Sequence, residues 1–134
     1  MGILIDTSIL INFERADTDV QAYIEGREEE EAFLSVISAS ELLHGVHRAP
    51  SSRTKARRLA FVEGVLAALP ILEIDLEIAR SHAWLWADLA RSGTMIGVHD
   101  SWLAATCIAH GLRLATGNLR EFERVSGLDI EEWK

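Results

Sequence analysis

The sequence predicts a three-layer α/β/α fold, in which a mostly parallel sheet of four or five strands lies between two layers of helices. Short runs that are apolar throughout, such as 3–5 and 71–72, are typical of strands buried on both faces. Longer stretches with apolar residues at helical spacing separate these runs. No repeat or composition break interrupts the 134 residues, so we expect a single domain over 1–134.

Turn and capping residues divide the chain into the expected elements. Strands are expected over the ranges 2–5, 32–36, 71–74, 112–115 and 128–130. Helices are expected over the ranges 8–14, 18–26, 38–48, 53–68, 76–91 and 100–110. The serines at 51–52 break the chain before one helix, and Pro70 introduces a strand. Asp75 can cap the helix that follows, while Gly93 and Gly111 end the last two helices.

The helix expected over 76–91 has a clear apolar stripe. Ile78, His82, Leu85 and Leu89 recur at helical spacing and should face the core. We therefore interpret His82 as a core histidine and not as a metal ligand. Trp84 points away from this stripe, which makes it either a contact with another chain or with RNA, or a ring lying flat on the surface.

Composition excludes several classes of protein. Apolar residues make up 49% of the chain, which excludes a disordered protein. The single Cys107 cannot form an internal disulfide, which suits a reducing cytosol, and we expect a cytoplasmic location. Asp6 interrupts the first apolar run, so this run is not a signal peptide. No stretch approaches the roughly 20 apolar residues of a membrane span.

Charge is unevenly spread along the chain. The net charge of −8 argues against a protein that coats nucleic acid non-specifically. Residues 42–62, however, contain no acid and carry five cations: Arg48, Arg53, Lys55, Arg57 and Arg58. This basic strip is either a track for phosphate groups or a solvated helix face.

Three carboxylates stand at the ends of expected elements, where α/β folds build their sites. Asp6 ends the run 3–5, Glu41 follows the second strand, and Asp100 opens the last helix. A carboxylate at such a place costs solvation free energy unless something neutralises it. Mg²⁺ or Mn²⁺ does so with oxygen ligands alone. The three acids therefore suggest a metal-dependent enzyme that acts on phosphate esters.

Each acid also has a purely structural interpretation. Asp6 can cap the first helix, although the residues at 7–8 can do so equally well. Glu41 can form a capping box with Ser38. Asp100 can stabilise a helix N-terminus through the helix dipole. Only the joint placement of the three acids favours a functional site.

Other chemistries fit the sequence less well. Glu41, His44 and His47 form a Glu-x-x-His pattern, but a di-iron bundle needs a second such motif and a four-helix frame. Acyl transfer would need a Gly-x-Ser-x-Gly elbow or an activated cysteine. A phosphatase with an aspartyl-phosphate intermediate would want a second Asp where Ser8 stands.

Several segments together resemble a known family. In order and spacing they resemble the motifs of PIN domains, and the last resembles the tail of VapC-type toxins of bacterial toxin–antitoxin pairs. These segments are 3–8, 38–45, 96–105 and 111–125. The likeness covers nearly the whole chain.

The resemblance implies a Mg²⁺- or Mn²⁺-dependent endoribonuclease that cuts structured RNA, such as tRNA or rRNA, and arrests translation. It also implies a homodimer and a small VapB-like antitoxin as partner. By position, Asp6, Glu41 and Asp100 match the family's metal-binding acids. The fourth acidic place falls on Asn118 or on Glu121.

On this hypothesis, a metal-activated water attacks the phosphodiester in line and leaves 5′-phosphate and 3′-hydroxyl ends. Thr7 or Thr116 would hold a water or a phosphate oxygen. The basic strip would contact RNA phosphates together with three further arginines: Arg113, Arg120 and Arg124. Two alternatives stay open. One is a PIN-like protein-binding module without nuclease activity, which Asn118 leaves possible. The other is a metal-dependent phosphatase or DNA nuclease on the same scaffold.

Overall fold

Strands and helices follow one another closely in the computed structural model, which describes residues 2–17 and 30–133. The strands are β1 (Ile3–Ile5), β2 (Ala32–Ser35), β3 (Ile71–Leu72), β4 (Arg113–Thr116) and β5 (Ile130–Glu132). The helices are α1 (Thr7–Arg15), α3 (Val36–His47), α4 (Ser52–Ala68), α5 (Leu76–Ser92), α6 (Val98–His110) and α7 (Leu119–Phe122). The helix predicted over 18–26 lies outside the described residues.

The five strands form one parallel sheet in the order β3-β2-β1-β4-β5. This confirms the predicted parallel sheet. The chain first builds outward from β1 to β3 and then returns to add β4 and β5 on the other side. The order therefore reverses between β1 and β4. In open parallel sheets, ligands bind outside the carboxyl ends of the strands at such a reversal. Asp6 and Thr116 stand there, at the ends of these two strands.

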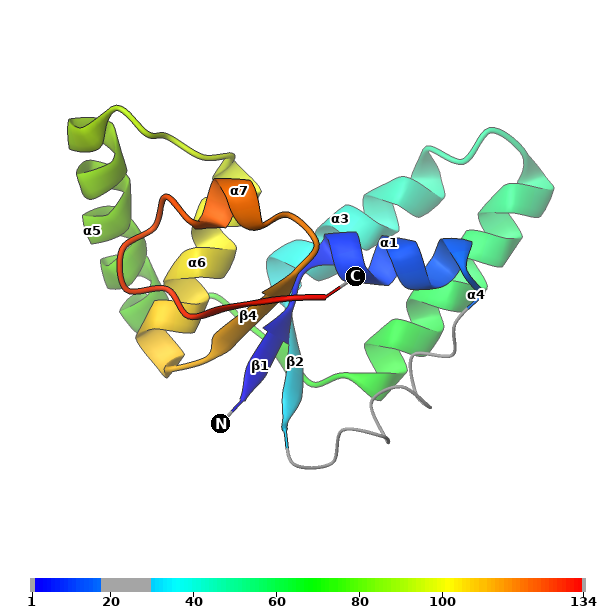
Figure 1. Ribbon diagram of the computed structural model, residues 1–134. Coiled ribbons are helices and arrows are strands. Elements are labelled where there is room, and N and C mark those ends of the chain that lie inside the picture. The colour runs from blue at the N-terminus through cyan, green and yellow to red at the C-terminus, as the bar shows by residue number, and fades with distance from the viewer. Residues whose placement is uncertain (1, 18–29, 134) are drawn as a thin grey trace.

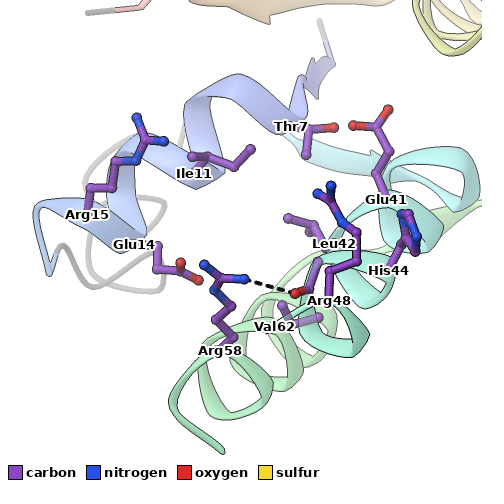
Figure 2. Close-up of a pocket in the computed structure, with 11 residues that line it drawn as sticks. Thr7, Ile11, Glu14, Arg15, Glu41, Leu42, His44, Arg48, Arg58 and Val62 are labelled. Atoms are coloured by element: carbon purple, nitrogen blue, oxygen red, sulfur yellow. Dashed lines mark hydrogen bonds between the residues drawn. The ribbon is translucent and has the colours of Figure 1, made fainter. Parts of the chain in front are cut away.

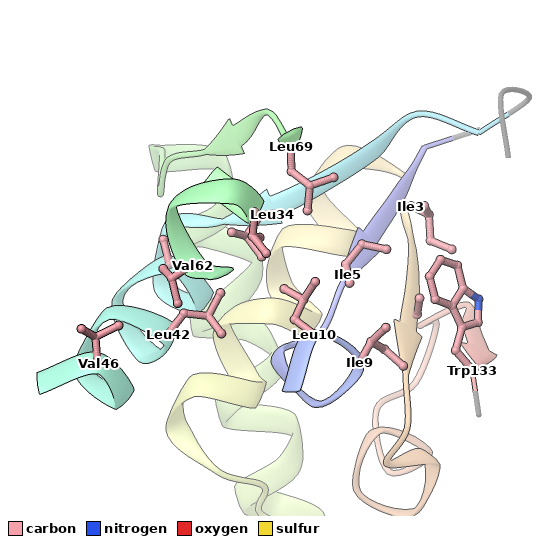
Figure 3. Packing of buried hydrophobic residues seen from close by; sticks show 13 residues of the cluster. Ile3, Ile5, Ile9, Leu10, Leu34, Leu42, Val46, Val62, Leu69 and Trp133 are labelled. Atoms are coloured by element: carbon pink, nitrogen blue, oxygen red, sulfur yellow. The ribbon is translucent and has the colours of Figure 1, made fainter. Parts of the chain in front are cut away.

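Successive strand residues contribute to opposite faces of the sheet, as the pleat requires. Ile3, Ile5 and Leu34 pack with α1, α3 and α4, and Figure 3 shows this cluster. Leu4 and Leu114 pack with the buried side chains of α5 and α6 on the other face. Figure 1 shows these two groups of helices on either side of the strands. The sheet is thus covered on both faces, which confirms the predicted three layers.

Two helices begin two residues earlier than predicted. In α3, Ser35 is the N-cap, and its side chain accepts a hydrogen bond from the amide of Ile37 (3.1 Å). In α6, the first helical residue is Val98 and the N-cap is Gly97. As a result, Glu41 falls in the second turn of α3 and Asp100 in the first turn of α6. The four-residue helix α7 was not predicted.

The interpretation of α5 is confirmed. Ile78, His82, Leu85 and Leu89 are its buried residues, and Gly93 ends it in the left-handed conformation with φ of 66°. Trp84 is 56% exposed and faces away from them. Among the described residues, no helix is long and apolar enough to cross a membrane.

Replacing Leu114 by alanine should destabilise the fold strongly. Leu114 is fully buried in the inner strand β4, on the face of the sheet that α5 and α6 cover. Loss of its side chain should lower the free energy of unfolding by about 2–5 kcal/mol. The matched control is Leu76→Ala, because Leu76 is 66% exposed; its effect should stay within about 0.5 kcal/mol. Urea denaturation measures both values, and equal effects would contradict this description of the core.

Candidate active site

Asp6 is a buried carboxylate at the point where the sheet order reverses. It occupies the N-cap position of α1, but its side chain makes no capping hydrogen bond. Instead, its Oδ2 accepts hydrogen bonds from Ser8 Oγ (2.9 Å) and Thr116 Oγ1 (2.8 Å). The capping interpretation of Asp6 is therefore wrong. Only 6% of the residue is exposed, and the carboxylate is held at the ends of β1 and β4.

Ser8 and Thr116 also tie the loop after β4 to this acid. Thr116 Oγ1 accepts a hydrogen bond from the amide of Asn118 (2.9 Å), and Ser8 Oγ accepts one from the amide of Gly117 (3.1 Å). Each hydroxyl therefore accepts from the loop and donates to Asp6. This arrangement makes Thr116 an orienting group for Asp6. Ser8 has the same role, which sequence analysis missed. Its hydrogen bond to Asp6 is local, whereas its bond from Gly117 depends on β4 lying beside β1.

Glu41 projects from the second turn of α3. Since Ser35 caps this helix and Ser38 lies inside it, the capping-box interpretation of Glu41 is wrong. The Oε1 of Glu41 accepts a hydrogen bond from the Nδ1 of His99 (2.7 Å), which lies in the first turn of α6. Sequence analysis did not single out His99, although it directly precedes Asp100.

Asp100 and Glu121 form a pair beside Gly97. A side-chain hydrogen bond joins the two carboxyl groups. Glu121 Oε1 also accepts from the amide of Gly97 (2.7 Å), and its Oε2 accepts from Asn118 Nδ2 (3.4 Å). The two residues considered for the fourth acidic place thus lie together. The short helix α7 brings Glu121 toward Asp100, while Asn118 contacts Glu121 through its amide.

The acids perturb one another. Burial raises the pKa of Asp6, while the hydrogen bonds from Thr116 and Ser8 oppose that rise. Burial also raises the pKa of Asp100 to about 7, and Glu121, Asp6 and Glu41 act in the same direction. The amide of Gly97 lowers the pKa of Glu121, so the proton of this pair resides on Asp100. Such mutual repulsion is relieved by a cation.

The donor set fits a hard divalent cation. Asp6 and Glu41 lie close enough to Asp100 to raise its pKa, and all three offer carboxylate oxygens, the ligands that hard cations prefer. A further oxygen lies close by. The buried hydroxyl of Thr7 has no hydrogen-bond partner, and Figure 2 shows it facing the carboxylate of Glu41. Both features suit a site for Mg²⁺ or Mn²⁺ with its water ligands.

A second group of potential ligands lies elsewhere. Within 2–17 and 30–133, Asp75, Glu77 and His110 are the only three such side chains with ligand atoms all within 4.8 Å of one another. Asp75 already caps α5 and accepts a hydrogen bond from His110 (3.1 Å). His110 lies ten residues after Asp100 on α6, roughly 15 Å along the helix. This exposed cluster therefore has a structural explanation and is remote from the acids at the strand ends.

A cleft of about 290 Å³ adjoins the acids. Its walls come from α1, α3 and α4, and Figure 2 shows them. The lining residues are Thr7, Ile11, Glu14, Arg15, Glu41, Leu42, His44, Gly45, Arg48, Arg58 and Val62. Carboxylates and guanidinium groups thus share one depression, and Figure 2 shows Glu14 on the side of Arg15 and Arg58, away from Glu41.

The predicted basic track is only partly found in this cleft. Arg48 and Arg58 line it, and Arg58 also donates to the carbonyl oxygen of Gly45 (3.0 Å). Arg57 is exposed but lies outside the lining. The assignment of Arg113 to the track is wrong. It begins β4, at the opposite edge of the sheet from Asp6.

The three further arginines of the predicted track have different surroundings. Arg113 pairs with Glu30 (2.7 Å) and Glu131 (3.1 Å), which accounts for its charge. Arg124 donates to the carbonyl oxygen of Met95 (3.0 Å). Arg120 is exposed on α7, near the acids, and stays a candidate phosphate contact.

Comparison with known proteins agrees with this architecture. A family model described as PIN domain matches residues 3–128. Ribonuclease VapC1 of Rickettsia felis is 36% identical over 130 residues, which are 97% of this chain and 95% of that protein. The tRNA(fMet)-specific endonuclease VapC of Salmonella typhimurium is 40% identical over 100 residues, 75% of this chain and 74% of that protein.

A solved structure agrees as well. A chain in the crystal structure of DNA-bound VapBC from Salmonella typhimurium superposes with a TM-score of 0.89 and 30% identity. The match covers 100% of this chain and 99% of that one. The fold is thus shared over the full length with a chain of that complex. The chain belongs to the PIN-domain family and, within it, to the VapC ribonucleases.

Proposed function

We propose that this chain is the toxin of a toxin–antitoxin pair and a Mg²⁺- or Mn²⁺-dependent endoribonuclease that cuts structured RNA to inhibit translation. The observation that carries the proposal is the gathering of Asp6, Glu41 and Glu121 around Asp100 at the carboxyl edge of the sheet, where burial and then these three acids raise the pKa of Asp100. A cluster of oxygen ligands of this kind, beside a basic cleft, suits hydrolysis of a phosphodiester.

In this mechanism Asp6, Asp100 and Glu41 hold the cation. When bound, the cation activates water and neutralises charge at the reacting phosphate. Thr116 and Ser8 keep the Asp6 carboxylate oriented through their hydrogen bonds. The buried hydroxyl of Thr7 is placed to donate to a water or to a phosphate oxygen.

We assign the fourth acidic place to Glu121 and not to Asn118. The hydrogen bond between Glu121 and Asp100 supports this assignment, and the amide of Asn118 donates to Glu121. Asn118 then orients an acid without being one. The alternative of a binding module without nuclease activity rested on Asn118, so it loses its support.

The substrate is proposed to be tRNA or rRNA. One relative carries the name tRNA(fMet)-specific endonuclease, which supports a tRNA substrate here. The position of Arg48 and Arg58 in the cleft supports the same class, because RNA reaches an acidic site only where local cations hold its phosphates.

We further propose a VapB-like antitoxin as partner, a homodimer, and a cytoplasmic location for the single domain 1–134. The related chain from Salmonella typhimurium was solved as part of a VapBC complex, which supports the antitoxin. Trp84 and Trp86 on α5 are 56% and 57% exposed, which supports a contact of this helix with another chain.

Cleavage of RNA should require both the metal and Asp100. Purified, antitoxin-free protein is incubated with a tRNA and rRNA mixture in Mg²⁺ or in EDTA. We expect discrete fragments with 5′-phosphate ends in Mg²⁺, and a loss of about 100-fold or more with Asp100→Asn or in EDTA. Asp88→Asn makes the same change on α5 and should cut normally. A variant Asp100→Asn that cuts at the wild-type rate would refute the assignment of this site, and 2′,3′-cyclic phosphate ends would refute water attack.

The stability of the metal-free protein should fall as the pH rises from about 4 to 7. The pKa of Asp100 is raised to about 7 in the folded state, against 3.8 for an unperturbed aspartate. The folded state therefore binds more protons than the unfolded state in this window, so stability is lost as the pH increases. We expect Asp100→Asn to flatten this loss and to raise the melting temperature at pH 8 in EDTA.

Melting temperatures at pH 4.5, 6 and 8 in EDTA provide this measurement, with Asp88→Asn as the control that keeps the wild-type slope. If Asp100→Asn melts with the same pH dependence as the wild type, the raised pKa of Asp100 is wrong. The test needs no RNA and is therefore independent of the cleavage experiment.

Charge reversal in the cleft should weaken RNA binding. Arg48→Glu places an anion in the lining, whereas Arg57→Glu makes the same change on an exposed surface outside it. We expect Arg48→Glu to weaken binding to a non-cleaved RNA. The slope of the logarithm of the binding constant against the logarithm of salt concentration should fall by about the share of one phosphate contact. Arg57→Glu should change both much less. Binding is measured by fluorescence anisotropy from 50 to 200 mM salt with an Asp100→Asn background, and equal effects of the two reversals would contradict this track.

A further inference from the structure

We infer that His99 is a positioning residue that fixes the carboxylate of Glu41 through its Nδ1–H, and thereby sets the affinity of the site for a divalent cation. This inference rests on the proposed function. It starts from one contact, the 2.7 Å hydrogen bond between His99 Nδ1 and Glu41 Oε1. The two residues lie 58 positions apart in sequence. Only the fold brings them together.

The direction of this hydrogen bond follows from its chemistry. An ionised carboxylate has lone pairs and no proton, so Glu41 can only accept. His99 therefore donates from Nδ1, whether its ring is neutral or charged. The bond orients the imidazole ring and the carboxylate together, as the partners of metal-ligating side chains commonly do.

Glu41 needs such a partner more than the other acids do. Asp6 is buried and receives two hydroxyl donors, and Glu121 receives the amide of Gly97. The side chain of Glu41 is longer, 33% exposed, and close enough to Asp100 and Asp6 to raise the pKa of both. Repulsion and side-chain entropy both favour its turning out to solvent. Within residues 2–17 and 30–133, His99 is the one hydrogen-bond donor to Glu41.

The position of His99 makes the bond a link across the site. Glu41 belongs to α3, which packs on one face of the sheet, and His99 belongs to α6, which packs on the other face. Asp100 follows His99 directly in the same helical turn. The first turn of α6 therefore supplies both Asp100 and His99, the donor that holds Glu41 on α3. The separation of Glu41 from Asp100 is set by this link.

Substitution of His99 can separate this role from a general structural one. His99→Asn keeps a donor in place, because the Asn amide nitrogen is bonded to Cγ as Nδ1 is. His99→Gln extends the amide by one bond and moves its nitrogen toward the position of Nε2, away from Glu41. His99→Ala removes the donor. Since the His99 side chain is 56% exposed, none of these changes opens a cavity in the core.

The first readout is Mn²⁺ binding without RNA, measured by calorimetry or by the spin resonance of free Mn²⁺. We expect His99→Ala and His99→Gln to weaken binding by about 10-fold or more. His99→Asn should stay within about threefold of the wild type, and so should the control His47→Ala, an exposed histidine on the same helix as Glu41. Affinities of all three His99 variants equal to the wild type, or an Asn variant as weak as the Ala variant, would overturn the inference.

The second readout is the Mg²⁺ dependence of cleavage. Loss of His99 should raise the Mg²⁺ concentration needed for half-maximal rate and leave KM for RNA unchanged, whereas partial unfolding would lower kcat at every Mg²⁺ concentration. If the wild type binds Mn²⁺ through Asp100 but cuts no RNA, the proposed function fails, and the Mn²⁺ series still decides on His99. If the wild type binds no Mn²⁺, both fail together.

Discussion

The site depends on one constraint: β1 and β4 lie side by side as the central parallel pair, and each ends at a residue that cannot be left unsatisfied. The pairing runs from Ile3 with Arg113 to Ile5 with Ala115, and the amide of Asp6 continues it by donating to the carbonyl oxygen of Ala115 (2.9 Å). Asp6 and Thr116 are therefore forced together at the carboxyl edge. A buried carboxylate without donors would destabilise the fold, and Thr116 supplies the donor.

From this pair outward, the fold gathers more negative charge than stability alone would favour. Asp100 and Glu121 are joined by a hydrogen bond, with the proton on Asp100, because the helices that carry them, α6 and α7, converge on the same edge. Hydrophobic packing on both faces of the sheet holds these elements in place regardless of the charges. The core thus stabilises a set of carboxylates that repel one another, which is the usual relation between a scaffold and a metal site.

The sequence predicted the acids well because strand ends and helix starts are local features. Asp6, Glu41 and Asp100 could be named as candidates from the apolar runs beside them, and a parallel sheet of four or five strands could be predicted from the same runs. What could not be found depends on strand order and register. His99 acts through Glu41, 58 residues away, and Ser8 joins its near neighbour Asp6 to the amide of Gly117, 109 residues away. No local pattern marks these links. Arg113 was assigned to the wrong edge of the sheet. It begins β4 and therefore lies at the amino edge of the sheet, whereas the acids lie at the carboxyl edge.

The charge distribution explains how an acidic protein can receive RNA. The net charge of −8 repels a polyanion at long range, and salt at physiological strength limits that repulsion to about 8 Å. Local charges then decide the approach. Arg48 and Arg58 stand in the cleft that ends at Glu41. A phosphate chain held there would lead to the acids, where only a cation makes its close approach favourable. Under the proposed function, cation and substrate would therefore favour each other's binding. The orientation of Glu41, at the junction of the cleft and the acids, affects both.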